Sequence, residues 1–402
     1  MSARARPRLV EEAAPAASPR YAVRKLALTD YRCYARLKIE ADERPVVLFG
    51  ANGAGKTNLL EALSFLAPGR GLRGATLAEV DRFGAGPWAV AASIATPAGD
   101  IEIGTGRTNE GRSNEDERSD KRAVRVNGAP ALAAADLAER LAVVWLTPAM
   151  DRLFLDSPSA RRKFLDRLVF AFDPAHAGRV NAYERALRER ARLLRDRIAD
   201  DAWLSALETQ MAERGVAVAA ARVAMADALN ASTAERQGAF PVATMALDGA
   251  VEAWLADGPA LAAEERFRAA LKAARTDDTF AGGASVGPHR SDIVVRHRER
   301  GTMADQLSTG EQKTLLVGIV LAHARLIAAE RGAAPLLLLD EVAAHLDERH
   351  RRALYGEIRA LGAQVWLTGT DAGLFDGLED EAQFFSVSGA ALMPAGPRSS
   401  AL

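Results

Sequence analysis

A glycine-rich stretch near the start of the chain has the G-x-x-x-x-G-K-[ST] spacing of a phosphate-binding loop: Gly50-Ala51-Asn52-Gly53-Ala54-Gly55-Lys56-Thr57, followed by Asn58. Glycines let backbone N–H groups curl around phosphate oxygens without interference from a Cβ atom. Lys56 is expected to reach the β- and γ-phosphates, and the Thr57 hydroxyl is expected to ligate Mg²⁺. The loop therefore predicts a nucleoside triphosphate site.

The segments on both sides of the loop support this prediction. Pro45-Val46-Val47-Leu48-Phe49 is apolar and β-branched, which favours a buried parallel strand. In the segment 58–66 the apolar residues recur at helical spacing. A strand, a tight turn and a helix N-terminus, whose dipole favours anions, form the arrangement that phosphate binding needs.

An apolar strand that ends in two acids is the second candidate for chemistry. Leu336-Leu337-Leu338-Leu339 precedes Asp340 and Glu341. A carboxylate at the C-terminal tip of a buried parallel strand lies at the sheet edge where phosphates bind. Asp340 is expected to hold Mg²⁺ through water, and Glu341 is expected to act as general base for the attacking water.

A serine- and glycine-containing segment lies about one helix before the acidic strand: Leu307-Ser308-Thr309-Gly310-Glu311-Gln312. By itself such a segment is often a helix N-cap with a polar first turn. Its position matches the signature of ABC-type ATPases, in which the signature of one subunit closes on the ATP held by the other. Ser308, Gly310, Glu311 and Gln312 are therefore predicted to act in trans, which implies an ATP-dependent homodimer.

Two further positions follow from the same order of motifs. Asp347, after Ala344-His345-Leu346, is predicted to be the aspartate of the D-loop. Thr370 follows the apolar segment 365–369 and takes the place of the switch histidine that transporter ATPases carry, so it is the predicted sensor.

Changes in composition and residue pattern along the chain divide it into segments. We expect a disordered leader at 1–20, an N-terminal part of an ATPase head at 21–149, a helical arm at 150–279, the C-terminal part of the head at 280–393 and a tail at 394–402. The segment 106–122 is highly charged and reads as an exposed hairpin loop. The predicted fold class is α/β, a P-loop NTPase of the ABC/SMC-head type with an inserted α-helical arm domain.

Two arginine-bearing segments leave alternatives open. The loop 69–74 contains Arg70 and Arg73, which either contact a nucleotide or DNA phosphate or are solvated charges. The helix expected at 181–198 carries six arginines interleaved with Glu184, Glu189 and Asp196. A solvated face with ion pairs explains that pattern, and contacts with DNA phosphates are the alternative.

Bulk properties exclude several classes of protein. The 402 residues have a formal net charge of −1, so a nucleic-acid surface must be a local patch. Cys33 is the single cysteine, which excludes an intramolecular disulfide framework and fits a reducing cytoplasm. The sequence shows neither eighteen uninterrupted apolar residues nor an apolar signal segment, so we expect no membrane span and a cytoplasmic location.

Taken together, the motifs resemble the RecF family of bacterial recombination mediators. The resemblance rests on Leu28-Thr29-Asp30-Tyr31-Arg32-Cys33-Tyr34, Gly50 to Asn58, Ser157-Pro158 with Arg161-Arg162-Lys163-Phe164-Leu165-Asp166, Gly287-Pro288-His289-Arg290, Leu307 to Gln312, and Leu339-Asp340-Glu341 with Leu346-Asp347. These motifs span nearly the whole chain in the family's order.

The resemblance implies a head like that of SMC-type ATPases with a short helical arm. It also implies ATP-dependent dimerisation, slow ATP hydrolysis triggered by DNA, and recognition of gapped duplexes or single/double-strand junctions. RecO and RecR would be partners in loading RecA, in recombinational repair and at replication forks.

Three rival functions fit the sequence less well. A transporter's ATPase subunit normally has a glutamine at the lobe junction and a switch histidine, but no glutamine occurs between Thr57 and Glu208 and Thr370 occupies the histidine's place. A small-molecule kinase leaves the segment 308–312 unexplained. A structural SMC-like ATPase needs a far longer coiled coil than the helical segment offers.

Overall fold

The computed structural model describes residues 20–108, 121–131, 135–196, 200–234 and 238–396. The leader expected at 1–20, apart from Arg20, lies outside the described residues. So do most of the charged segment expected at 106–122 and most of the tail expected at 394–402. Residues 106–108, 121–122 and 394–395 of these segments belong to strands, because the flanking strands run further than the sequence pattern predicted.

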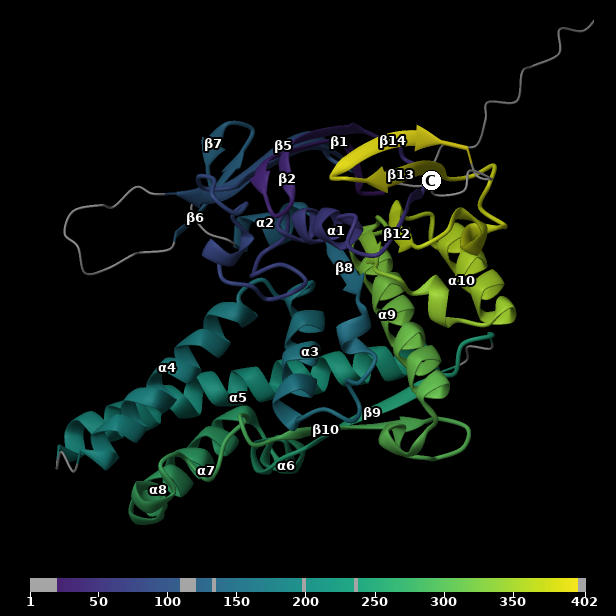
Figure 1. The fold of residues 1–402 in the computed structure, drawn as a ribbon. Helices are drawn as coiled ribbons and strands as arrows, with labels where there is room; N and C mark the ends of the chain where they lie inside the picture. The colour runs from purple at the N-terminus through teal and green to yellow at the C-terminus, as the bar shows by residue number, and fades with distance from the viewer. Residues whose placement is uncertain (1–19, 109–120, 132–134, 197–199, 235–237, 397–402) are drawn as a thin grey trace, which may run out of the picture.

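A mostly parallel sheet forms the centre of the head (Figure 1). Its strands lie in the order β14 (Ala391–Ala395), β13 (Gln383–Ser388), β3 (Val46–Phe49), β12 (Val365–Gly369), β11 (Leu336–Leu339) and β8 (Val143–Leu146). Every residue of β3, β11 and β12 is buried, as expected for near-continuous apolar strands covered on both faces. Strands from both ends of the sequence are therefore hydrogen-bonded neighbours, β3 with β12 and β8 with β11.

A second, antiparallel sheet covers the first helix of the head (Figure 1). Its strands lie in the order β2 (Tyr34–Glu40), β1 (Ala22–Tyr31), β4 (Ala89–Thr96), β5 (Gly99–Thr108), β6 (Lys121–Val126) and β7 (Ala129–Pro130). Leu26, Leu28 and Tyr31 of β1 face inward and join the main hydrophobic core. This sheet faces the core with one side only, so its strands alternate where those of the parallel sheet do not.

Four helices complete the head: α1 (Lys56–Ser64), α2 (Ala135–Arg140), α9 (Thr309–Arg331) and α10 (Glu348–Leu361). Helix α9 is long and apolar enough to cross a membrane, but 67% of its most apolar window is buried inside the fold. Its residues Leu315, Leu316 and Val320 lie in the main core. The apolar character of α9 is explained by this central position.

The arm projects from the head at the lower left of Figure 1. It comprises α3 (Pro158–Phe170), α4 (His176–Arg195), α5 (Asp201–Ser232), α6 (Ala250–Asp257), α7 (Ala260–Ala273) and α8 (Arg275–Ala281). A separate hydrophobic core that includes Tyr183, Met211 and Phe267 holds α4, α5 and α7 together. Asp173-Pro174 separates α3 from α4, and the Asp200 side chain caps α5 by accepting from the Trp203 N–H.

The arginines of α4 do not all lie on a solvated face. Arg188 pairs with Glu184 and Arg192 with Glu189 on the surface, as the charge pattern predicted. Arg190, however, is 1% exposed and donates to the buried Glu208 of α5 (3.0 Å) and Asp278 of α8 (2.7 Å). Its role is to fasten three helices, because a buried guanidinium is tolerated only where it is paired.

The segment 150–279 is not wholly helical. Strand β9 (Ala243–Asp248) lies inside it and pairs antiparallel with β10 (Asp292–His297), which lies beyond its end. The partner strand is remote in sequence, so the alanine-rich local composition did not reveal the pairing.

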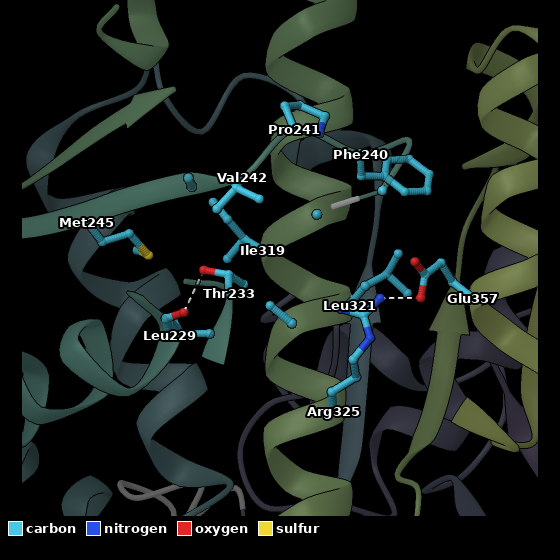
Figure 2. A pocket seen from close by; sticks show the side chains of 14 residues that line it. Leu229, Thr233, Phe240, Pro241, Val242, Met245, Ile319, Leu321, Arg325 and Glu357 are labelled. Atoms are coloured by element: carbon cyan, nitrogen blue, oxygen red, sulfur yellow. Dashed lines mark hydrogen bonds and ion pairs between the residues drawn. The ribbon is translucent and has the colours of Figure 1, made fainter. Parts of the chain in front are cut away.

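A short segment before β9 crosses the middle of α9 (Figure 2). The Cβ of an alanine at Gly318 would lie 2.7 Å from the carbonyl oxygen of Pro241, too close for normal contact. Beside this crossing a cavity of about 30 Å³ is lined by apolar side chains such as Ile319 and Met245. Arg325 of α9 and Glu357 of α10 form an ion pair at its edge. Gly318 is thus required by packing.

Replacement of Gly318 by alanine should lower the free energy of unfolding. Alanine gains about 1 kcal/mol of helix propensity over glycine, but overpacking typically costs about 1–3 kcal/mol. Gly356 in α10 is the matched control, because a Cβ there meets no atom within 4 Å. Gly356→Ala should stabilise the protein, and chemical denaturation of both variants would show it. Equal stabilisation by the two substitutions would contradict the packing role of Gly318.

Candidate nucleotide-binding and catalytic site

The predicted phosphate-binding loop connects β3 to α1. Gly50 has φ 152°, and a Cβ there would lie 2.3 Å from the Val387 carbonyl oxygen of β13. Gly55 has φ 112°, and a Cβ there would lie 2.5 Å from the Tyr34 hydroxyl. Only glycine fits both positions, since each combines positive φ with close neighbours. The backbone is consequently held in the conformation that presents the α1 N-terminus.

The N-terminus of α1 is open to an anion. Within the described residues no side chain caps it, and its first turn contains no acidic residue. The backbone N–H groups and the helix dipole therefore supply positive potential at this end of the helix. Residues 51–53 are exposed, so the loop is accessible to a ligand.

Lys56 lies at the first position of α1 and folds back over the loop. Its Nζ donates to the carbonyl oxygens of Gly50 (2.6 Å) and Ala51 (2.9 Å). Burial lowers the pKa of Lys56 from its ordinary value, while the charges of Glu341 and Asp340 act in the opposite direction. The ammonium group is thus placed between the loop and the two acids that the sequence singled out.

Thr57 and Asp340, predicted as the two metal-binding side chains, meet in the structure. The Thr57 hydroxyl donates to Asp340 Oδ1 at 2.9 Å, although the residues are 283 positions apart. The Thr368 hydroxyl, from the neighbouring strand β12, donates to the same oxygen at 2.8 Å. Burial raises the pKa of Asp340, and the bonds from Thr368 and Thr57 oppose that effect.

Glu341 has an uncommon backbone conformation next to this cluster. Its φ is 52°, in the left-handed region that residues other than glycine rarely adopt. Its N–H donates to Thr368 Oγ1 at 2.8 Å, which helps to hold this conformation. Strained residues of this kind are concentrated at functional sites. The side chain of Glu341 is partly exposed, which leaves it accessible at the sheet edge.

The turn between β1 and β2 packs against the loop and α1. The Tyr34 hydroxyl donates to the Gly55 carbonyl oxygen (3.1 Å), and Asn58 Nδ2 lies 3.2 Å from Cys33 Sγ. Arg32 donates twice to the buried carboxylate of Glu61 on α1, at 2.8 and 2.7 Å. This turn braces the helix whose N-terminus forms the predicted phosphate site.

The predicted signature residues form the start of α9. Ser308 is the N-cap and makes a capping box with Glu311, so the N-cap geometry considered above is present. The Arg300 guanidinium lowers the pKa of Glu311 to about 2, and Gln312 Nε2 donates to the Leu307 carbonyl oxygen at 2.9 Å. All of these partners lie within the segment 300–312, and none belongs to the phosphate-binding loop at the start of α1. Contact with a nucleotide remains a prediction.

Asp347 and Thr370 lie at the ends of elements near the site. Asp347 caps α10, accepting from the His350 N–H (2.8 Å), and its side chain is 64% exposed. Thr370 is exposed and lies just beyond the end of β12. Their predicted roles in the D-loop and as a sensor stay predictions.

The sequence reasoning missed Thr368. A polar residue within a fully buried strand was the available signal, since Val365, Trp366 and Leu367 before it are apolar. A buried hydroxyl normally has a hydrogen-bond partner, so a partner on an adjacent strand was to be expected.

The fold and this site define the class of the protein: a P-loop ATPase of the ABC/SMC-head type with an inserted helical arm. The sequence model of the family described as RecF/RecN/SMC N terminal domain matches residues 22–390. The chain is 51% identical over 370 residues to the DNA replication and repair protein RecF of Mesorhizobium japonicum, covering 91% of this chain and 96% of that protein. It is 49% identical over 374 residues to RecF of Brucella suis, covering 92% and 95%. The chain therefore belongs to the RecF family.

Solved structures agree on the fold. A structure of the recombination mediator protein RecF-ATP in the RecFOR pathway matches with a TM-score of 0.78 at 22% identity, covering 94% of this chain and 100% of that one. An Smc head domain from Pyrococcus furiosus, bound to the C-terminal domain of ScpA, matches with a TM-score of 0.52 at 16% identity, covering 93% and 96%. At these identities the likeness establishes the architecture.

Thr368→Val should weaken the site in two ways. It removes the donor to Asp340 and leaves the Glu341 N–H without its acceptor. The free energy of unfolding should therefore fall by about 1–3 kcal/mol. ATP hydrolysis should fall as well, because Asp340 loses a partner that orients it.

Thr370→Val is the matched control for stability. Its exposed side chain should change the free energy of unfolding by less than about 0.5 kcal/mol, although hydrolysis should fall if Thr370 senses the nucleotide. Denaturant titration and a phosphate-release assay measure both quantities. A stability loss larger for Thr370→Val than for Thr368→Val would contradict the assigned geometry.

Proposed function

We propose that this chain is an ATP-dependent DNA-binding protein of recombinational repair and replication-fork maintenance. ATP would join two copies into a dimer that binds gapped duplex or single/double-strand junction DNA, and slow, DNA-stimulated ATP hydrolysis would open it. The observation that carries the ATPase part of the proposal is the convergence of Thr57, Asp340 and Thr368, beside Lys56 and Glu341. The names of the RecF relatives, DNA replication and repair proteins, support the cellular role.

The residues present fit ATP with Mg²⁺. Thr57 Oγ1 and Asp340 Oδ1 offer two hard oxygen donors 2.9 Å apart beside an uncapped helix N-terminus. Among the described residues no group of three or more His, Cys, Asp or Glu side chains could hold a metal ion. That donor set suits Mg²⁺, which commonly uses one or two protein ligands together with substrate phosphates and water.

Each side chain then has a chemical task. Thr57 and Asp340 would hold Mg²⁺, which supplies the charge neutralisation that phosphoryl transfer requires. Lys56 would leave its carbonyl partners in the loop and bind phosphate oxygens. The Glu341 carboxylate would orient the attacking water and accept its proton.

The location of the signature supports a site shared between two copies. Ser308 and Glu311 bond to each other, Glu311 also accepts from the nearby Arg300, and the helix they start is buried in the core along much of its length. A rigid, buried helix does not bring its N-terminus to the loop of the same chain by a local movement. The N-terminus of α9 would instead meet the ATP of a second copy.

Several parts of the proposal rest on the family alone. RecR and RecO would be partners, RecA would be loaded indirectly, and the protein would act in the cytoplasm. The RecFOR pathway named for the structural relatives supports this context. A transporter ATPase subunit or a structural SMC-like ATPase remains the alternative, and neither is favoured by a specific feature of the site.

Mixing two inactive variants tests the shared site. Lys56→Ala should abolish ATP binding in its own loop, and Ser308→Arg should block the signature without touching the loop. Neither homodimer has an intact site, but a heterodimer has one, built from the normal loop of one copy and the normal signature of the other.

A 1:1 mixture that exchanges subunits freely should therefore recover about a quarter of the wild-type ATPase rate, as expected for a two-fold symmetric dimer. Lys56→Ala carrying Ser308→Arg in the same chain is the control and should recover nothing when mixed with either single variant. Full activity of Ser308→Arg alone would contradict the role of the signature.

A further inference from the structure

A large groove lies between the head and the start of α4 in the arm. It has a volume of about 1250 Å³ and is bounded on the head side by the segment around Gly69 and Arg70 and by Arg122 of β6. On the arm side it is bounded by the first turns of α4 and by Arg214 of α5. In Figure 1 the start of α4 lies below the head, next to this boundary. The ATP site described above does not include any of these residues.

The charge of the groove has one sign. Four arginines line it, Arg70, Arg122, Arg179 and Arg214, and no aspartate or glutamate is among its described lining residues. Arg70 and Arg214 are exposed and have no ion-pair or hydrogen-bond partner in the part of the chain that the structure describes. Because the whole chain has a net charge of −1, this concentration of positive charge is a local feature that attracts polyanions.

The N-terminus of α4 opens into the same groove. Its N-cap is Ala175, which cannot cap with a side chain, and the first turn contains no acidic residue. The backbone N–H groups of Ala177 and Gly178 donate to no group within the described residues. Such a helix start is suited to a phosphate group, because free N–H donors and the positive end of the dipole coincide.

Asp173, which precedes the helix, is already engaged. Its Oδ1 accepts from the Ala175 N–H at 3.1 Å, and its Oδ2 pairs with Arg179. It neutralises part of the charge of Arg179, so Arg70, Arg122 and Arg214 supply most of the positive potential.

The head wall of the groove is held rigidly. Arg122 donates to the carbonyl oxygens of Phe65, Ala67 (3.1 Å) and Gly69 (2.8 Å), which fastens the loop to the end of α1. Burial lowers the pKa of Arg122 to about 10, so the guanidinium stays protonated at neutral pH. A fixed wall loses little conformational entropy when a ligand binds.

From this geometry we infer that the groove binds the sugar–phosphate backbone of DNA, with one phosphate at the N-terminus of α4 and its neighbours against Arg70 and Arg214. This inference rests on the DNA-binding function proposed above and assigns that function a surface. It also favours one of the two explanations of Arg70 left open by the sequence, contact with a DNA phosphate. Arg188 and Arg192 of α4 are placed outside the contact, because each is paired with a glutamate.

The first experiment compares two double variants with the same change of charge. In Arg70→Ala/Arg214→Ala, two exposed groove arginines are removed. In the control, Arg188→Ala/Arg192→Ala, two arginines of the α4 surface are removed. Binding of full-length protein to a fluorescent gapped duplex would be measured with ATP over a range of salt concentrations.

The groove variant should bind at least about tenfold more weakly at low salt. The slope of its log binding constant against log salt concentration should become shallower by the amount that about two phosphate contacts contribute. The control should bind nearly as well as the wild type. ATP affinity and ATP-dependent sedimentation should be unchanged in both. Equal loss in the two variants, or no loss in either, would overturn the inference.

A second variant separates folding from binding. Gly178 is exposed in the first turn of α4, and a Cβ there meets no atom within 4 Å. Gly178→Glu should raise thermal stability or leave it unchanged, because an acid favours a helix N-terminus. It should nevertheless weaken DNA binding several-fold, and Gly178→Gln should weaken it less. Unchanged DNA binding by Gly178→Glu would contradict a phosphate at this position.

Failure of the inference differs from failure of the proposed function. If wild-type protein with ATP does not bind gapped duplex, the proposed function is wrong, and the inference falls with it. If wild-type protein binds and the groove variants bind equally well, only the location is wrong.

Discussion

The hydrogen bond between Thr57 and Asp340 is the interaction on which the rest of the site depends. It joins the first turn of α1 to the tip of β11, two elements separated by the entire arm in the sequence. The bond requires β3 and β11 to lie on either side of β12 in one parallel sheet, which is the observed order. Thr368 of β12 completes the contact from the strand between them. The nucleotide site is therefore built by sheet pairing rather than by any local segment.

Because the site depends on the pairing of these strands, their burial at the centre of the head matters for its geometry. The strands β3, β11 and β12 have no exposed residue, so their register is fixed by packing on both faces. A shift of one residue would turn Asp340 away from Thr57. The strained backbone of Glu341 is likewise held by the same neighbour, Thr368. Rigidity at this edge of the sheet holds the buried Asp340 and the partly exposed Glu341 next to each other in different surroundings.

The arm follows a different rule, because its own core and its own buried ion pairs hold it together. Arg190, Glu208 and Asp278 join three helices without any contribution from the head. The base of the arm packs against the head, because Leu165 of α3 and Leu229 of α5 belong to the main hydrophobic core, and a positively charged groove lies beside this contact at the start of α4. The groove at the start of α4 is left available for a ligand.

Residue spacing predicted much of this architecture and less of its detail. The loop 50–57, the strand 336–339 and their meeting were predictable, because glycine, lysine and carboxylate positions follow from the chemistry of phosphate binding. The strand β9, the burial of Arg190 and the contact of Thr368 were not, since each depends on a partner distant in sequence. Composition also described the arginines of α4 as one set, whereas the fold divides them between the surface and the interior.

The central claim is that ATP binds between two copies of the chain and that this dimer holds DNA. Sedimentation of Glu341→Gln with ATP, with ADP and without nucleotide, each with and without gapped duplex DNA, tests it most directly. We expect a dimer with ATP but not with ADP or without nucleotide, and we expect this dimer to migrate with the DNA. A monomer under every condition would contradict it and would leave an ATP-binding fold without a shared site.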